Sequence, residues 1–494
     1  MNFLENYINF VAALGVNITR KEWWYTSLSS KNRFQSSLMA DYELFKEGKQ
    51  SLEKPIVPGF RFIFFAIIAM GIKSLYAWIV TMPQKRKLLS QGQARTVLMT
   101  FSFPGSYSGA NFKDTYWGPL PEFLRKEVPV LQIVSPVGAF FQSIRCAEIH
   151  PDVLPIYSFI SPWIYLKNLS RLFVMPWRWK VDKDLPLSDK IEHMLKLESC
   201  NDSFFYALLV EDVFKSLVKK QLVSKVIVPY EGNAWERAVV IGVKEADPKI
   251  KITAYVHTVV PEISASIFVG QNEYQNGPFP DEILTLGEIP TKLLNERGHY
   301  PEGVVKTSCA LRFTNLLKLK AYGPTSEKRL LVVLEGVFQV VKIVDYFLIQ
   351  ATHNPDWEFL LRFHPALPWE KIKNVSQFKG EFPLNVSFSK GEPLFEEIKQ
   401  SAAVAYWGST AGIEALFLGR PILHIELGSI LSYDSLFMHD GYHWRVPIQC
   451  ELSAVLQKID SLSEDKKNEL SLESRNFLHQ YFTEVTDERL KLFF

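Results

Sequence analysis

The sequence has little of several features that would define a function outright. Lysine and arginine number 55 against 53 aspartate and glutamate, so the formal net charge is only +2. A charge this small does not draw a protein onto a nucleic-acid backbone, and we expect no nucleic-acid partner. The four cysteines stand far apart without a CxxC pair, which argues against a zinc site and against a disulfide framework.

A secretory signal is also missing at the N-terminus. An acidic residue, Glu5, precedes the first apolar stretch, and no small-residue cleavage site follows it. We therefore expect the chain to work in the cytoplasm. Its 494 residues are too many for one ordinary core and predict two domains, and a 47% apolar, 22% charged composition is that of a well-packed globular protein.

One apolar, aromatic run stands out over residues 60–87, and it ends in a basic cluster at 85–87. A membrane-spanning helix needs about 20 uninterrupted apolar residues, and Lys73 interrupts this run near its middle. An in-plane helix fits better, with Tyr76 and Trp78 at the interface and the cluster on anionic head groups. We expect peripheral contact with the inner face of the cell membrane. A buried helical hairpin and a true span stay open as alternatives.

Short apolar runs bounded by turn residues begin at Arg95 and alternate with helical stretches. This alternation predicts parallel sheets with helices on both faces. The pattern stops after Arg312 and then restarts, which predicts two Rossmann-like domains. Expected strands of the first domain are 95–103, 128–136, 224–230, 250–258 and 281–287. Those of the second are 329–336, 357–365, 384–391, 401–410 and 419–426.

The predicted organisation has three segments. A mainly helical, membrane-associating extension over 1–95 precedes a Rossmann-like domain over 96–318, and a second such domain with terminal helices covers 319–494. Ligands of open α/β sheets bind at the carboxyl ends of the strands, so we expect the two domains to face each other across a crevice that holds the chemistry.

Glu231 directly follows the expected strand at 224–230 and precedes Gly232. A carboxylate in that place would act as a general base toward a hydroxyl, a role worth roughly a hundred- to ten-thousand-fold in rate. In the structural alternative, Glu231 caps the following helix, because acids favour the first helical turn. His257, at the end of the strand over 250–258, is expected to point toward the same crevice.

In the second domain, the strand over 357–365 delivers Arg362, His364 and Pro365 to the sheet's top. An imidazole and a guanidinium there would hold a leaving phosphate as negative charge grows on it. Glu335 and Gly336 end the first strand of this domain, where we expect the chain to pass close to a nucleotide.

Gly408, Ser409 and Thr410 form a small-residue turn between a strand and a helix. The backbone N–H groups and hydroxyls of such a turn suit a phosphate or carboxylate. Alternatively, Ser409 and Thr410 are only N-caps, and the two roles are compatible. Glu414, about one turn into the helix, is placed to accept hydrogen bonds from ribose hydroxyls, with a surface acid as the alternative.

A Gly/Ser-rich loop over 101–121 carries Asp114 and Tyr116, which we expect to contact an acceptor sugar or a lipid-linked phosphate. The loop has neither a GxGxxG nor a GKS pattern, so no standard dinucleotide or P-loop site is predicted. The chain's only Asp-x-Asp pair, Asp182 and Asp184, follows no apolar strand, and we expect a solvated loop and a site without metal.

Three motifs together resemble the set found in bacterial sialyltransferases and related Kdo-type transferases that use CMP-activated acidic sugars. They are YEG at 230–232, HP at 364–365 and ST at 409–410, in that order, although Tyr230 stands where the family usually has a second acid. The wider pattern is similar to surface carbohydrate biosynthesis proteins encoded with O-antigen genes, and it covers about residues 96–426.

The resemblance implies a GT-B glycosyltransferase of lipopolysaccharide, O-antigen or capsule assembly. It implies inverting, metal-independent transfer of a nonulosonic or Kdo-like sugar from a CMP-sugar to a growing glycan or lipid-linked acceptor, without a cofactor. The donor would bind 319–494 and the acceptor 96–318. Glu231 would be the base, and His364 with the turn at 408–410 would hold the departing nucleotide.

Three alternatives stay open. A nucleoside-diphosphate hexose is an equally suitable donor for Glu414 and the 408–410 turn. An epimerase-like enzyme acting on UDP-sugars would share the fold, but a soluble substrate gives no reason for a membrane-binding segment. A non-catalytic scaffold of a polysaccharide assembly complex is the third alternative, in which replacing Glu231 or His364 would leave the surface polysaccharide unchanged.

Overall fold

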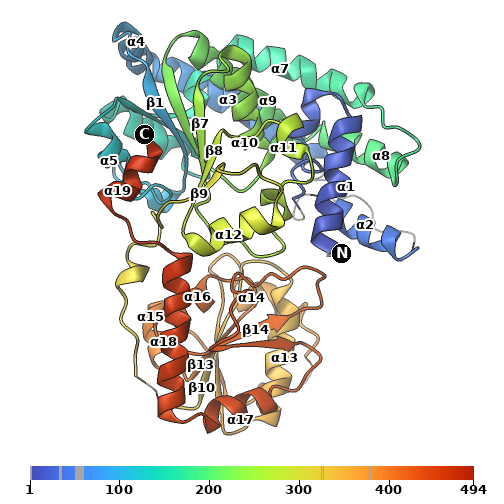
Figure 1. Ribbon diagram of the computed structural model, residues 1–494, viewed down its shortest axis with the longest axis vertical. Helices are drawn as coiled ribbons and strands as arrows, with labels where there is room; N and C mark the ends of the chain where they lie inside the picture. Colours follow the sequence, from blue (N-terminus) through green and yellow to red (C-terminus); the bar gives the residue numbers. More distant parts are fainter. Residues whose placement is uncertain (1–2, 33–35, 50–59, 324, 326, 379–380) are drawn as a thin grey trace. The chain divides into compact units, whose positions relative to one another are not determined.

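The computed structural model describes residues 3–32, 36–49, 60–323, 325, 327–378 and 381–494. It forms two compact units. Unit 1 comprises Met1–Thr258, Ser264–Arg312 and Val485–Phe494, and unit 2 comprises Val259–Ile263 and Phe313–Glu484. Each unit is built on one parallel sheet packed with helices (Figure 1). The predicted pair of Rossmann-like α/β domains with a helical N-terminal region is confirmed.

The sheet of unit 1 has seven strands, all paired in parallel, in the order β5-β4-β1-β6-β7-β8-β9. The order runs outward in both directions from a reversal between β1 and β6, which is the position where doubly wound sheets bind ligands. The strands are β1 (Arg95–Ser102), β4 (Val130–Pro136), β5 (Val153–Pro155), β6 (Val223–Pro229), β7 (Lys251–Tyr255), β8 (Glu282–Thr285) and β9 (Val305–Thr307). A small hairpin, β2 (Tyr107–Ser108) with β3 (Asn111–Phe112), lies within the Gly/Ser-rich loop.

The sheet of unit 2 repeats this plan with six parallel strands in the order β12-β11-β10-β13-β14-β15. Its reversal lies between β10 and β13. The strands are β10 (Arg329–Val333), β11 (Glu358–Arg362), β12 (Val386–Phe388), β13 (Ala403–Tyr406), β14 (Ile422–Glu426) and β15 (His443–Pro447). The apolar side chains of this sheet share one buried core with α13 (Val340–His353).

The remaining helices cover the two sheets. Those of unit 1 are α1 (Phe3–Asn17), α2 (Leu38–Lys46), α3 (Phe60–Val80), α4 (Met82–Ser90), α5 (Leu120–Arg125), α6 (Phe140–Ile149), α7 (Pro162–Val174), α8 (Ser188–Glu198), α9 (Asp202–Lys219), α10 (Ala234–Ala246), α11 (Glu273–Asn276), α12 (Glu288–Arg297) and α19 (Asp487–Leu490). Those of unit 2, besides α13, are α14 (Trp369–Ile372), α15 (Leu394–Lys399), α16 (Ala411–Phe417), α17 (Ser453–Ser461) and α18 (Glu464–Tyr481). Short 3-10 helices include η1 (Lys21–Tyr25), η3 (Ile156–Phe159) and η4 (Met175–Arg178).

The N-terminal region is helical, as predicted, but it is part of unit 1 rather than an appendage. Lys31 forms a buried ion pair with Glu273 of α11 at 2.7 Å between Nζ and Oε2. Lys21 of η1 pairs with Glu211 of α9 at 2.6 Å. A buried charge is costly without such a partner, so these pairs fix where the region packs.

The end of the chain returns to unit 1. The ring of Phe493 packs edge-on against Tyr255 of β7, with 5.6 Å between centroids. Lys225 Nζ of β6 donates to the backbone oxygen of Phe494 at 2.7 Å. The expected second domain at 319–494 therefore differs from unit 2 in its last ten residues, because apolar side chains at the chain's end are buried on the first sheet.

Helix α3 is the one described helix that is long and apolar enough to cross a membrane. Its window Arg61–Val80 has a mean hydropathy of 2.0, and 22% of that window is buried. Ile63, Met70, Ser74 and Ala77 form the buried stripe on unit 1. The opposite side exposes large apolar side chains, among them Phe62, Phe65, Ile72 and Ile79. The alternative of a buried hairpin does not hold in this structure.

Candidate functional site

The turn after β6 places Glu231 at the sheet's reversal. Gly232 has a left-handed φ of +79°, and a Cβ there would lie 1.9 Å from the carbonyl oxygen of Ser266, so only glycine fits. Asn233 and Glu236 form a capping box at the start of α10. The Glu236 carboxylate accepts hydrogen bonds from the backbone N–H groups of residues 231, 232 and 233. The cap is therefore supplied by Glu236, and the side chain of Glu231 is left for another role.

Glu231 faces His257, which follows the neighbouring strand β7. His257 Nε2 lies 3.3 Å from Glu231 Oε1, and Asn233 Nδ2 donates to Glu231 Oε2 at 3.2 Å. Burial, followed by the positive charge of Arg312, lowers the pKa of His257 to about 3, so its ring is neutral at pH 7. Since an ionised carboxylate only accepts hydrogen bonds, the neutral ring carries its proton on Nε2. Nδ1 is then a buried acceptor without a hydrogen-bond partner among the described residues.

Glu231 combines access with a perturbed acidity. Its side chain is 45% exposed, so a substrate hydroxyl can reach it. Burial of the rest raises its pKa above the ordinary value of 4.5, while the hydrogen bond from Asn233 and the charge of Arg312 oppose the rise. A carboxylate whose pKa moves toward neutrality is a better proton acceptor at pH 7.

Tyr116 and Arg312 complete this cluster. The Tyr116 ring lies 4.7 Å from that of His257, and the guanidinium of Arg312 lies over the Tyr116 ring at 5.1 Å. Tyr116 was predicted from the loop. Arg312 was not, because it lies at the end of unit 1, where no strand or motif in the sequence marks it.

Asp114 comes from the same loop but is engaged in holding it. Its carboxylate accepts from the backbone N–H groups of Tyr116 at 2.8 Å and Trp117 at 3.2 Å. Thr100 and Gln132 each donate to it at 3.1 Å. Burial raises the pKa of Asp114 to about 6 against these hydrogen bonds. With both oxygens occupied, Asp114 is placed to position Tyr116, and the predicted contact with an acceptor falls to Tyr116.

Unit 2 contains a cavity of about 560 Å³ at the carboxyl ends of β10 and β11. A volume of this size suits a nucleotide-sized ligand. Most of the residues predicted to bind the donor line it: Glu335, Gly336, Arg362, His364, Pro365 and Ser409. Sequence analysis missed Trp369 and Glu370 of α14 and Phe388 of β12, which also line it.

His364 offers a hydrogen-bond donor to this cavity. The backbone N–H of Ala366 donates to His364 Nδ1 at 3.1 Å, so the neutral ring carries its proton on Nε2. The side chain is exposed. A Cβ on Gly336 would lie 2.8 Å from Nδ1, so a glycine at the end of β10 makes room for the imidazole.

Arg362 has a partner of its own. Its Nη1 lies 2.6 Å from Glu397 Oε2 and also donates to the carbonyl oxygen of Glu392 at 2.6 Å. Its charge is thus partly neutralised by a buried carboxylate, and it orders the chain around residue 392. Its remaining N–H groups are what it can offer a ligand.

The turn at 408–410 is hydrogen-bonded to a side chain of the protein itself. Glu335 Oε1 accepts from the backbone N–H of Gly408 at 2.8 Å, across the reversal between β10 and β13. Burial raises the pKa of Glu335 against the backbone N–H groups of the turn. Its Oε2 is buried and has no hydrogen-bond partner among the described residues. The backbone N–H of Gly408, which was expected to suit a phosphate or carboxylate ligand, is therefore already taken by Glu335.

The last predicted residues lie around this turn. Ser409 Oγ accepts from the backbone N–H of Ala411 at 3.2 Å, and Thr410 is the N-cap residue without a side-chain capping hydrogen bond. Glu414 is half-buried on α16 and lies outside the residues that line the cavity. Burial raises its pKa, and the charge of Arg362 opposes this. A nucleotide contact by Thr410 or Glu414 stays a prediction.

Within the described ranges, no group of three or more His, Cys, Asp or Glu side chains is gathered as a metal ion requires. Asp182 and Asp184 lie in an exposed turn, where Asp182 accepts from the backbone N–H of Asp184 at 3.1 Å. Metal independence stays a prediction.

No protein-family model and no curated protein matches the chain. Among solved structures, the chain is similar to the glycosyltransferase SnogD from Streptomyces nogalater, with 15% identity, 81% of this chain and 99% of that chain covered, and a TM-score of 0.42. The calicheamicin glycosyltransferase CalG4 is 10% identical, with 81% of this chain and 98% of that chain covered and a TM-score of 0.47. A UDP-GlcNAc 2-epimerase from Methanocaldococcus jannaschii, in complex with UDP-GlcNAc and UDP, is 12% identical, with 77% of this chain and 100% of that chain covered and a TM-score of 0.42. At these values the likeness assigns neither activity nor substrate, and the function rests on the residues of this chain.

Proposed function

We propose that the protein is a glycosyltransferase that moves a sugar from a nucleotide-sugar held by unit 2 to a hydroxyl group activated by unit 1. One observation carries the proposal. Glu231, with a raised pKa, stands partly exposed at the reversal of a doubly wound sheet and is held by a neutral histidine 3.3 Å away. A carboxylate whose pKa is perturbed by burial in an accessible place is a candidate general base.

In the proposed reaction, Glu231 takes the proton of the acceptor hydroxyl as its oxygen attacks the anomeric carbon. The bond between that carbon and the donor's phosphate oxygen breaks, and the nucleotide leaves with the electron pair. Attack from the face opposite the leaving group inverts the anomeric centre. His257 orients the carboxylate.

The departing phosphate is assigned to His364, which lines a cavity of suitable volume and accepts a backbone hydrogen bond at Nδ1. A donor aimed at developing negative charge stabilises the transition state more than the ground state.

For the donor, we propose a CMP-sugar carrying an acidic sugar, transferred to a surface glycan. One free imidazole donor and one guanidinium already paired with Glu397 match one phosphate better than two. The second candidate is a nucleoside-diphosphate hexose, whose second phosphate the remaining N–H groups of Arg362 could bind.

We further propose that the enzyme works at the cytoplasmic face of the cell membrane through residues 60–87. Helix α3 is buried along one stripe for most of its length, from Ile63 to Ala77. Crossing the bilayer would force the elements packed on that stripe into the hydrocarbon region. Lying in the membrane plane keeps the stripe on unit 1 and puts the exposed apolar side into lipid.

The test is thermal-shift binding of CMP, CDP, UDP, GDP and ADP to the full chain, followed by transfer assays with the sugar donors of any nucleotide that binds. Stabilisation by CMP above the others supports the acidic-sugar donor. A preference for UDP or another diphosphate replaces that donor by the hexose. Binding of none of the five, with a correctly melting protein, contradicts the enzyme proposal and favours the scaffold.

A further inference from the structure

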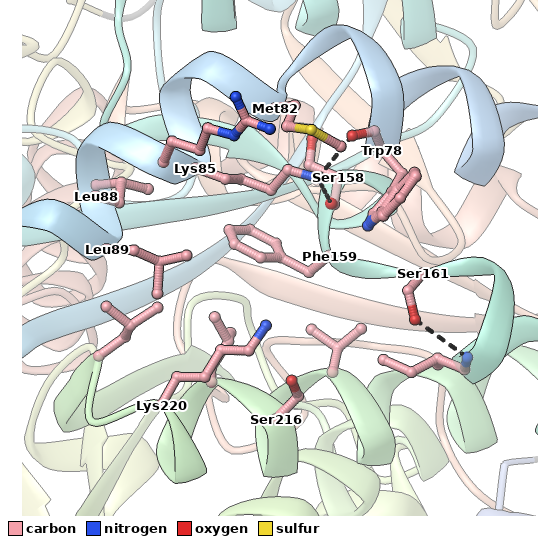
Figure 2. A pocket seen from close by; sticks show the side chains of 15 residues that line it. Trp78, Met82, Lys85, Leu88, Leu89, Ser158, Phe159, Ser161, Ser216 and Lys220 are labelled. Atoms are coloured by element: carbon pink, nitrogen blue, oxygen red, sulfur yellow. Dashed lines mark hydrogen bonds between the residues drawn. The ribbon is translucent and has the colours of Figure 1, made fainter.

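A second cavity lies in unit 1, away from the residues of the transfer reaction. It has a volume of about 200 Å³ and is enclosed by α3 and α4, by η3 with the start of α7, and by the end of α9 (Figure 2). Its walls are mostly apolar, with Trp78, Met82, Leu89, Phe159, Ile164 and Leu217 among the lining residues. None of its lining residues is shared with the cavity of unit 2.

Three cations edge this apolar cavity: Lys85 and Arg86 from α4 and Lys220 from the end of α9. No acidic residue lines it, and within the described part of the chain none of the three forms an ion pair with a carboxylate. Figure 2 shows Lys85 and Lys220 entering from opposite walls. Lys85 Nζ donates to the carbonyl oxygens of Trp78 at 2.7 Å and Ser158 at 2.8 Å, which leaves one N–H of three.

The positive charges here are uncompensated. Burial, and then the charge of Lys220, lower the pKa of Lys85 to about 8. A lysine whose charge is disfavoured by burial and by a neighbouring cation is stabilised when an anion binds between the two. The cavity thus combines apolar walls with a demand for negative charge at one edge.

The surface around the cavity is also apolar and positively charged. Next to α3, the segment of α7 and η4 exposes Trp163 to 75%, Phe173 to 71% and Trp177 to 86%. The two segments touch, since Tyr165 Oη donates to the carbonyl oxygen of Ile67 at 2.9 Å. Residues 60–94 hold five lysines and arginines, residues 156–181 hold four, and neither segment has an acidic residue. Of these nine basic residues, Lys167 and Arg171 form ion pairs with acids of α9. The net charge of the two segments stays positive.

Size and chemistry together select the occupant. The cavity is smaller than the roughly 300 Å³ at which pockets begin to enclose a whole small ligand, so it takes only part of a molecule. A free phosphate would make no use of the apolar walls, and a neutral apolar molecule would leave the cations unmatched. A lipid satisfies both, because the part that does not fit can lie along the exposed apolar sides of α3 and α7.

We propose that this cavity binds a lipid with an anionic, phosphate-containing head group. The phosphate lies between Lys85, Arg86 and Lys220, and part of one chain lies against Trp78 and Phe159. The site is separate from the transfer reaction, and the proposal holds whether or not the transferase assignment does.

The test is isothermal titration of the full chain with dihexanoyl phosphatidylglycerol below its critical micelle concentration. Dihexanoyl phosphatidylcholine tests the head-group charge, and inorganic phosphate tests the free anion. We expect one site for the phosphatidylglycerol and binding at least about tenfold weaker for each of the other two. Equal binding of the neutral lipid overturns the anionic class, and equal binding of inorganic phosphate overturns the lipid.

Variants locate the site. Lys220→Gln and Arg86→Gln should each weaken phosphatidylglycerol binding about fivefold, the loss of one basic contact near an anionic surface. The matched controls are Lys219→Gln and Lys87→Gln, exposed neighbours that do not line the cavity. Ser216→Phe fills the cavity without changing charge and should also weaken binding. Equal losses in Lys219→Gln and Lys220→Gln, or full affinity in Ser216→Phe with an unchanged melting curve, overturn the proposal.

Discussion

The candidate sites of the two units are built differently on sheets of the same plan. In unit 1, Glu231 and His257 come from neighbouring strands and face each other, and burial shifts the pKa of both. In unit 2, Arg362 and His364 come from one strand end and line an open cavity, with the histidine exposed. The difference teaches that strand ends of one sheet plan can present either a partly buried acid–histidine pair or a cavity with accessible hydrogen-bond donors.

Replacing the base should give the largest effect. We expect Glu231→Gln to lower kcat about a thousandfold, since the amide cannot take the acceptor's proton. Nucleotide binding, measured by thermal shift, should stay as in the parent protein, because unit 2 is unchanged. The matched control is Glu302→Gln, an exposed acid of unit 1. A kcat within a few fold of the parent's would remove Glu231 from the reaction.

Replacing Gly232, in the turn that presents Glu231, should lower the stability of the protein more than replacing a glycine of the same φ elsewhere. Gly232 and Gly303 share a φ of +79°, but only at Gly232 would a Cβ meet backbone, 1.9 Å from the carbonyl oxygen of Ser266. Gly303→Ala should cost about 1–2 kcal/mol of unfolding free energy for the left-handed conformation alone. Gly232→Ala should cost clearly more.

Denaturant unfolding of the two glycine variants measures this difference. Equal losses would mean that the backbone around Ser266 moves aside at little cost. In that case the turn does not fix the position of Glu231, and the contrast between a rigid unit 1 site and an open unit 2 cavity weakens.

Removing the exposed histidine of unit 2 should act on binding. His364→Ala should weaken nucleotide affinity about ten- to a hundredfold, the range for one hydrogen bond to a charged group. His353→Ala, an exposed histidine on α13, is the control. Gly336→Ala keeps the imidazole but crowds its Nδ1 at 2.8 Å and should weaken binding to a smaller extent. Unchanged affinity in His364→Ala would move the phosphate elsewhere.

The smallest effect concerns how the activity that depends on Glu231 varies with pH. Glu231 must be ionised to act, so kcat/KM falls as the pH drops through its pKa, which burial raises above 4.5. The charge of Arg312 lowers that pKa. Arg312→Gln should therefore move the acidic limb of the pH profile to higher pH. Arg145→Gln, an exposed arginine of α6, should leave the limb in place, and a limb that shifts downward in Arg312→Gln would contradict the assignment.

The sequence predicted ten of the thirteen strands described in the two large sheets and missed three that lie at sheet edges. All ten expected strands are present, from β1 to β14, because three or more apolar residues between turn signals are a strong local pattern. The edge strands β5 and β9 have three residues each, and β15 begins with a histidine. Such segments become strands because a neighbouring strand supplies their hydrogen bonds, which the sequence does not display.

For the sites, the sequence marked the residues at strand ends but not the residues that come from elsewhere. Glu231, His257, Arg362 and His364 each follow an apolar run, so their place at a sheet edge could be inferred. Arg312 joins the unit 1 cluster from a segment without a pattern, and Glu236 takes the cap that was considered for Glu231.

What the sequence alone determined is the local order of the chain: which runs are strands, that two doubly wound domains follow a helical region, and which polar residues end the strands. These depend on spacing within about ten residues. Only the tertiary structure decided which side chains meet. It paired Glu335 with the turn at Gly408, bound Arg362 to Glu397, and gathered Lys85 and Lys220 at one cavity from helices far apart in the chain. Burial and charge act through space, so pairings between distant segments are fixed only when the chain has folded.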